Sequence, residues 1–145
     1  MLVPGSNRRV FPIDKHVGMV VAGYLADGKQ IVSRAREEAE NYRNTYGHHI
    51  LPTILADRLS LYTHYFTIYG SLRPFGSTAI FAGFDEDLDS PQLYMVEPSG
   101  AVFRFFGCAA GKGANAAKTE LEKVLNKYGT AGISSRQAVK ELARV

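Results

Sequence analysis

The stretch DKHVGMVVAGYLADG, residues 14–28, decides the fold because it passes from a strand through a turn into a helix. Within Val17–Ala22, apolar residues alternate with apolar or small ones, which is typical of a strand covered on both faces. Gly23 lets the chain leave that strand. After Gly28, apolar residues recur at helical spacing, at Ile31, Ala35, Ala39, Tyr42 and Tyr46. The stretch therefore predicts a buried strand followed by an amphipathic helix.

Further strands and helices are expected on both sides of this stretch. VFPID (10–14) predicts a strand before it, and the first helix is expected from about Ala26 to Tyr46, ending at Gly47. The other expected elements are a helix over about Thr53–Ser71 introduced by Pro52, a strand in FGSTAIFAGFD (75–85), a hairpin of QLYMVE (92–97) and AVFRFFG (101–107), a helix over about Ala114–Tyr128, and a last helix from Ser134 or Ser135 to Val145. This order predicts a layered α+β fold.

Composition narrows the class of protein. The 145 residues give room for one domain with a real core, and 46% of them are hydrophobic. The net charge of +3 is spread along the chain without a basic run, so a nucleic-acid partner is not expected. No segment predicts a membrane span or a secretory signal, and no membrane partner is expected. A single cysteine, Cys108, excludes an intramolecular disulfide and indicates a reducing compartment, the cytoplasm or nucleus.

Four motifs occur in order along the chain. They are DKHVGMVVAGYLADG (14–28), RPFG (73–76), LYMVEPSG (93–100) and GCAAGKGANAAKTELEK (107–123). Together, and in their spacing, they resemble the α-type subunits of the 20S proteasome. GSNRR (5–9) and KTELEK (118–123) are most similar to the eukaryotic alpha type three branch of that family.

The resemblance implies a fold and a role. The family fold is a four-layer αββα sandwich of the N-terminal nucleophile hydrolase type. This chain would be its central portion, without the N-terminal tail, first helix and first two strands, and without the C-terminal strands and helix. Family members form a seven-membered α ring that stacks on β subunits, gates substrate entry and docks regulators in ubiquitin-dependent protein breakdown. The resemblance implies no cofactor.

No catalytic residue is predicted. Hydrolases of this type use a Thr, Ser or Cys at residue one, with its free α-amine as the base, whereas residue one here is Met. The α-type family is itself non-catalytic. Two alternatives remain open beside a structural ring subunit: an active threonine-type peptidase exposed by processing, and a free-standing interaction module.

Arg9 is the one residue with a candidate recognition role. The resemblance places it where many α-type subunits carry a lysine that helps to bind the C-terminal carboxylate of a regulator. Arginine keeps the positive charge of lysine, but its guanidinium is planar and donates several hydrogen bonds, whereas the ammonium of lysine is compact. An exposed surface arginine beside Arg8 is the competing interpretation.

Several other residues have expected structural roles. The motif residues are Arg73, Pro74, Phe75, Gly76, Gly111 and Gly113. Arg73 could pair with a carboxylate at a helix-to-strand junction. Gly111 and Gly113 fail the phosphate-loop pattern because no Ser or Thr follows Lys112, and close strand-to-helix packing is expected of them instead.

The histidines and the cysteine predict neither catalysis nor a metal site. Asp14 and His16 share one face of a strand but lack a nearby nucleophile, which favours a surface pair at the strand end. His48, His49 and His64 lack the i, i+4 spacing of a helical zinc site and are expected on a loop or a helix surface. Cys108 is expected to be a buried, inert thiol.

Overall fold

The structure is a computed structural model that describes residues 3, 5–129 and 133–144. The chain divides into two compact units, residues 1–104 and 105–145. The single domain expected from the chain length stays a prediction.

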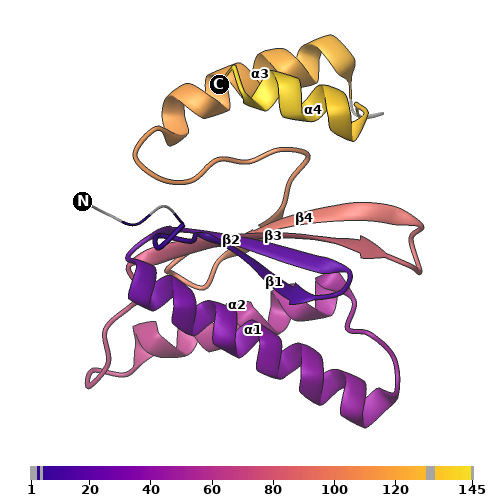
Figure 1. The fold of residues 1–145 in the computed structure, drawn as a ribbon. Helices are drawn as coiled ribbons and strands as arrows, with labels where there is room; N and C mark the ends of the chain where they lie inside the picture. Colours follow the sequence, from indigo (N-terminus) through magenta and orange to yellow (C-terminus); the bar gives the residue numbers. More distant parts are fainter. Residues whose placement is uncertain (1–2, 4, 130–132, 145) are drawn as a thin grey trace. The chain divides into compact units, whose positions relative to one another are not determined.

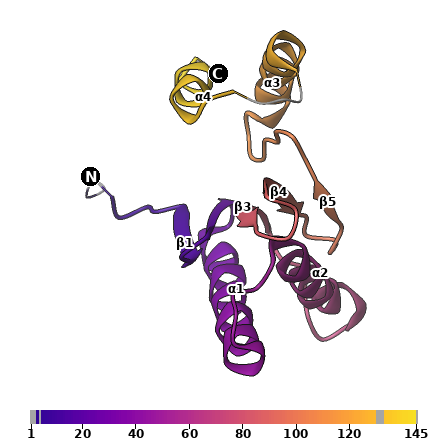
Figure 2. The ribbon, with the colours of Figure 1, turned by 90° about the vertical axis from the view of Figure 1, so that its right-hand side faces the viewer.

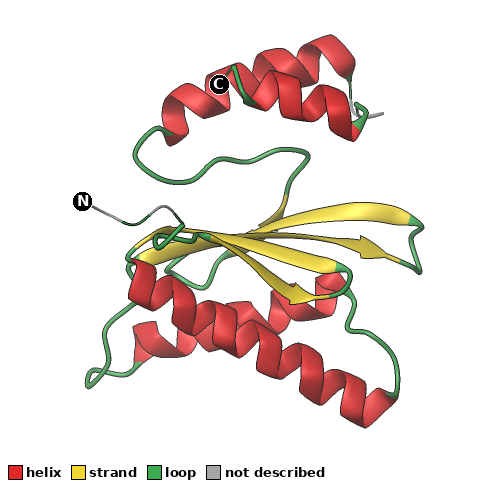
Figure 3. Cartoon of the chain, in the orientation of Figure 1, coloured by secondary structure: helices red, strands yellow, loops and turns green. Residues whose placement is uncertain are grey.

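The first unit is built on one antiparallel sheet of five strands in the order β1-β2-β3-β4-β5 (Figures 1 and 3). The strands are β1 (Val10–Asp14), β2 (Val17–Gly23), β3 (Ser77–Asp85), β4 (Ser90–Val96) and β5 (Val102–Arg104). Every expected strand is present, although β5 is shorter than the predicted strand 101–107. The central strand β3 pairs with β2 and β4, and Phe81 lies opposite both Met19 and Tyr94.

Two helices inserted between β2 and β3 cover one face of this sheet (Figure 2). α1 (Leu25–Tyr46) ends at Gly47, whose φ of 78° is left-handed and whose N–H donates to the Arg43 carbonyl at 2.8 Å. α2 (Pro52–Ile68) begins at its proline and ends three residues before the predicted Ser71. The predicted boundaries of the first helix are confirmed to within one residue.

The core lies between the sheet and these helices. Its largest fully buried side chains include Phe81, Met19, Ile31, Leu55 and Leu59. On β2, Val17, Met19 and Val21 are buried, whereas Val20 on the opposite face is 39% exposed. Within the first unit, α1 and α2 therefore cover one face of this strand, because both pack on the same face of the antiparallel sheet. Coverage of its other face stays a prediction.

The second unit contains α3 (Ala114–Tyr128), with the predicted boundaries, and α4 (Ser135–Leu142). Within it, the Tyr128 hydroxyl donates to Glu141 at 3.0 Å, and Lys127 lies 3.6 Å from the same carboxylate. Ser134 is the N-cap of α4 and makes no side-chain capping bond. Val145, the predicted helix end, lies outside the described residues.

The predicted α+β class is confirmed, since the described residues form one antiparallel sheet and four helices. All five strands in the described part of the chain belong to a single sheet. None of its helices combines the length and apolar character that crossing a membrane would require.

Candidate functional site

Asp27, in the first turn of α1, is held by the loop that leads into β3. Its carboxylate accepts two hydrogen bonds from the Arg73 guanidinium, at 2.7 and 2.9 Å, and one from the Gly76 N–H at 2.7 Å. The Arg73 hydrogen bonds, helped by the Gly76 N–H, outweigh the desolvation of the carboxyl and lower the pKa of Asp27 to about 2. We call Asp27, Arg73 and Gly76 the junction clamp. It joins the start of α1 to the start of β3.

The rest of the RPFG motif supports the same junction. Phe75 is buried, and its ring packs on Phe66 with a centroid distance of 4.5 Å. The Gly76 carbonyl accepts the Tyr24 N–H at 2.9 Å, and a Cβ on Gly76 would lie only 2.2 Å from the Tyr24 ring. The Pro74 carbonyl accepts a further bond from Arg73 at 3.1 Å. The carboxylate expected for Arg73 is thus Asp27, which sequence reasoning did not name.

Arg9 is half-buried and bonded to the backbone of β2. Its guanidinium donates to the Gly23 carbonyl at 2.9 Å and reaches the Val21 carbonyl at 3.5 Å. The side chain therefore fastens the segment before β1 to the end of β2. A guanidinium carries five N–H donors, so this contact uses only part of its capacity.

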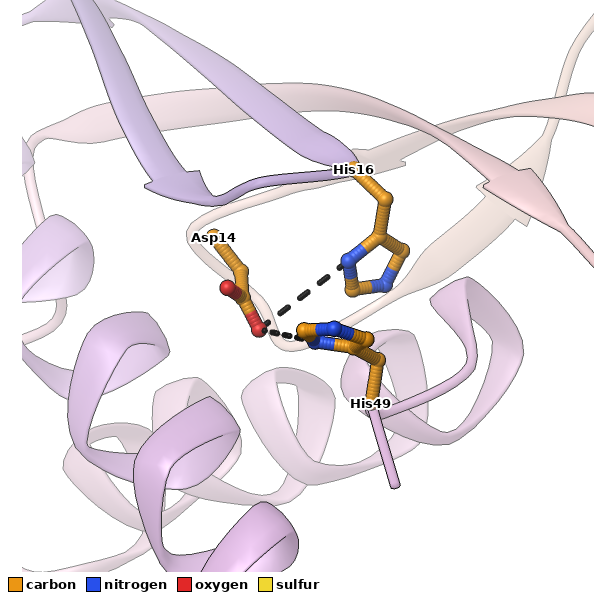
Figure 4. Close-up of side chains that lie close together, drawn as sticks. All are labelled: Asp14, His16 and His49. Atoms are coloured by element: carbon orange, nitrogen blue, oxygen red, sulfur yellow. Dashed lines mark hydrogen bonds and ion pairs between the residues drawn. The ribbon is translucent and has the colours of Figure 1, made fainter.

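Asp14, His16 and His49 lie together at the turn between β1 and β2 (Figure 4). Asp14 Oδ2 is 3.0 Å from His49 Nδ1 and 4.0 Å from His16 Nδ1. We call these three residues the His–Asp cluster. The structure confirms the predicted nearness of Asp14 and His16, whereas His49 joins them from the loop between α1 and α2, 35 residues along the chain from Asp14.

The Asp14 carboxylate of the cluster is ionised and held in place. Its burial opposes ionisation, but the Lys15 N–H, the His49 hydrogen bond and the charge of Arg43 together hold its pKa below the usual value. Oδ1 accepts the Lys15 N–H at 2.7 Å, and Arg43 lies 3.7 Å from the same oxygen. Oδ2 is left to face the two imidazole rings.

The second unit contains the two motif glycines and the cysteine. Gly111 has a φ of 113°, which lies in the left-handed region that favours glycine. Gly113 is the N-cap of α3, and a Cβ there would meet nothing within 4 Å. Within the second unit, Gly113 therefore has no close neighbour beside it, and its packing against a strand stays a prediction. Cys108 is half-buried, and this burial raises the pKa of its thiol against the opposing charge of Lys118, as expected of an unreactive cysteine.

Comparison with protein families decides what kind of chain this is. A family model described as "Proteasome subunit" matches residues 1–145. The chain belongs to the proteasome subunit family. The resemblance of its four motifs to that family is confirmed.

Within the proteasome family, the similarity is to α-type subunits. "Proteasome subunit alpha type-3" of Dictyostelium discoideum is 48% identical over all 145 residues, and the protein of that name in Spinacia oleracea is 49% identical over the same length. "Probable proteasome subunit alpha type-7" of Saccharomyces cerevisiae is 41% identical. The chain covers 56%, 56% and 49% of these relatives, so it spans about half their length. The predicted similarity to alpha type three is confirmed.

In this proteasome-family chain, both residue groups depend on the opening motif. The junction clamp takes Asp27 from it, and the His–Asp cluster takes Asp14 and His16. The motif therefore contributes more than a strand and a helix. It supplies the polar anchors at both ends of β2.

Proposed function

We propose that this chain is a non-catalytic, structural α-ring subunit of the 20S proteasome core. It acts by assembling with other α subunits in a seven-membered ring and with β subunits, and it contributes to substrate-entry gating and regulator docking in ubiquitin-dependent protein breakdown. The cytoplasm and nucleus are the proposed locations. The observation that carries this proposal is an apolar surface on α2, in a chain whose relatives are named α-type subunits.

This surface consists of Leu61, Tyr65, Ile68 and Tyr69, and we call it the outer α2 face. Leu61 is 71% exposed and Ile68 is 60% exposed, whereas Leu59 on the inner side of α2 is fully buried. The rings of Tyr65 and Tyr69 pack together with a centroid distance of 4.3 Å. A contiguous exposed patch of aliphatic and aromatic side chains is typical of a protein–protein interface. We infer that a neighbouring α subunit covers it.

Changing two residues of the outer α2 face to glutamate tests the assembly role. We expect the double variant Leu61→Glu, Tyr65→Glu to lose incorporation into α rings, because an interface buried on assembly would then contain two unpaired charges. Both side chains are exposed, so the fold of the chain is preserved. The measurement is native mass spectrometry of rings after co-expression with the other α subunits.

The control for this experiment is Asp87→Lys, a charge change at an exposed position in the turn between β3 and β4. It should enter rings as the unchanged chain does. Equal incorporation of the Leu61→Glu, Tyr65→Glu variant would contradict the proposed interface. Covalent attachment of a threonine-directed inhibitor to this chain, with cleavage of fluorogenic peptides, would contradict the non-catalytic role.

Arg9 is the proposed contact for the regulator's C-terminal carboxylate. In assembled rings, we expect Arg9→Ala to weaken binding of a regulator-derived peptide about tenfold, the cost of one charge-assisted hydrogen bond. Arg8→Ala is the matched control, since Arg8 is adjacent and exposed. Fluorescence anisotropy with a peptide ending in a free carboxylate gives the affinity. An equal loss in both variants, or equal binding of the amidated peptide, would exclude a specific role for Arg9.

A further inference from the structure

We propose that Asp14, His16 and His49 bind one zinc ion. Each residue offers one ligand atom, and these three atoms lie within 4.8 Å of one another. One carboxylate oxygen and two imidazole nitrogens are ligands that Zn²⁺ takes in proteins. The proposal departs from the sequence-based prediction of no metal, because the spacing of the histidines in the chain did not show that His49 meets the other two residues.

The two distances from the Asp14 oxygen to the histidine nitrogens lie on either side of the value for tetrahedral zinc. Zinc–nitrogen and zinc–oxygen bonds of about 2.0–2.2 Å at tetrahedral angles separate two ligand atoms by about 3.4 Å. Asp14 Oδ2 lies 3.0 Å from His49 Nδ1 and 4.0 Å from His16 Nδ1. Each of these two distances differs from that value by about half an ångström, so small movements of the side chains bring both oxygen–nitrogen pairs to it.

The ring of His16 is already oriented as a ligand. Its Nε2 lies 2.7 Å from the Ile50 carbonyl oxygen, and because a carbonyl only accepts, Nε2 carries the proton. In the neutral ring, Nδ1 then holds a lone pair. This nitrogen is buried and has no hydrogen-bond partner. A metal-bound histidine usually donates the N–H of its other ring nitrogen to a backbone carbonyl or a carboxylate, as Nε2 of His16 does here. A cation bound at Nδ1 would give this buried nitrogen the partner it lacks.

Asp14 and His49 supply the other two ligands. The Lys15 N–H occupies Oδ1 of Asp14, which leaves Oδ2 as a single ligand oxygen. Without metal, His49 Nδ1 donates its proton to this oxygen. Zinc would take the place of that proton on Nδ1, and the neutral ring would then carry its single proton on Nε2. The side chain of His49 is 40% exposed, so the ion has a path to the cluster.

Three protein ligands leave one coordination position for water. A pocket of about 300 Å³ adjoins the cluster and is lined by both of its histidines as well as His48, Phe84 and Glu86. Water can therefore reach the ion, as in zinc sites with an open position. The carboxylate of Glu86 adds negative charge to the pocket, which favours a cation.

Zinc titration of the metal-free chain tests the proposal. By isothermal titration calorimetry at neutral pH, we expect one zinc per chain, and His49→Ala should weaken binding at least tenfold. Asp14→Asn should do the same while keeping an acceptor for the Lys15 N–H. His48→Ala is the matched control, because His48 is adjacent in sequence and lines the same pocket but lies outside the cluster. Zinc should also raise the melting temperature of the unchanged chain and of the control, but not that of His49→Ala.

Three results would overturn the proposal. The first is the absence of saturable zinc binding up to about 1 mM. The second is one-to-one binding with the same affinity in His49→Ala and Asp14→Asn, which would place the ion elsewhere. The third is an equal loss in His48→Ala and His49→Ala, which would indicate general histidine binding.

Discussion

Replacing Gly23 by alanine is expected to destabilise the first unit by about 3 kcal/mol or more. Gly23 ends β2 with a φ of 110°, a conformation that side-chain-bearing residues rarely adopt. An added Cβ would lie 2.3 Å from the Gly76 carbonyl oxygen and 2.8 Å from the Ser77 Cα. Both atoms belong to the backbone, so no rotamer change relieves the contact. The Gly76 carbonyl also accepts the Tyr24 N–H, and the clash would strain that bond.

The measurement is urea unfolding followed by circular dichroism. Gly18→Ala is the matched control, because Gly18 lies in the same strand and a Cβ there would meet nothing within 4 Å. We expect the control to keep its unfolding midpoint, since alanine is at least as compatible with a strand as glycine. Equal unfolding midpoints for Gly23→Ala and the unchanged chain would contradict the prediction. They would show that the backbone near Gly76 moves away from the added Cβ without loss of stability.

The sequence predicted the elements whose signals are local. Gly47 and Pro52 mark the end of α1 and the start of α2 because each sets the backbone conformation at its own position. The boundaries of α3 followed from apolar spacing within that helix alone. The hairpin of β4 and β5 followed from the turn at Pro98–Gly100, where Gly100 has a φ of 86°.

The polar groups that the fold brings together were beyond prediction from one sequence. Asp27 and Arg73 are 46 residues apart, and Asp14 and His49 are 35 residues apart. Such pairs depend on the strand register and on the position of the loop that follows α1. No sequence pattern near the paired residues shows either of these. Which face of β2 the two helices cover was beyond prediction for a related reason. Alternation of apolar residues shows that a face could be covered, whereas the packing of α1 and α2 decides which face is.

Removing the carboxylate of Asp27 is expected to cost about 2 kcal/mol of stability at neutral pH. Asp27→Ala leaves the Gly76 N–H without its acceptor and deprives Arg73 of a bidentate partner. Asp27→Asn should cost less, because the amide oxygen can still accept the Gly76 N–H. In a double-mutant cycle, Asp27→Asn and Arg73→Ala should be non-additive, since each removes the same ion pair.

The same carboxylate gives the junction clamp a defined pH dependence. The folded-state pKa of Asp27 is about 2, below the ordinary value of 3.8, so its ionisation favours the folded state. The stabilisation is complete above about pH 4 and is lost as the pH falls towards 2. The stability difference between the unchanged chain and Asp27→Asn should therefore shrink over that interval in urea unfolding. Glu37→Gln, at an exposed carboxylate on α1, should leave the pH profile unchanged. A constant difference between the unchanged chain and Asp27→Asn at every pH would mean that the Asp27 carboxylate contributes packing alone, without the charge-assisted bonds to Arg73.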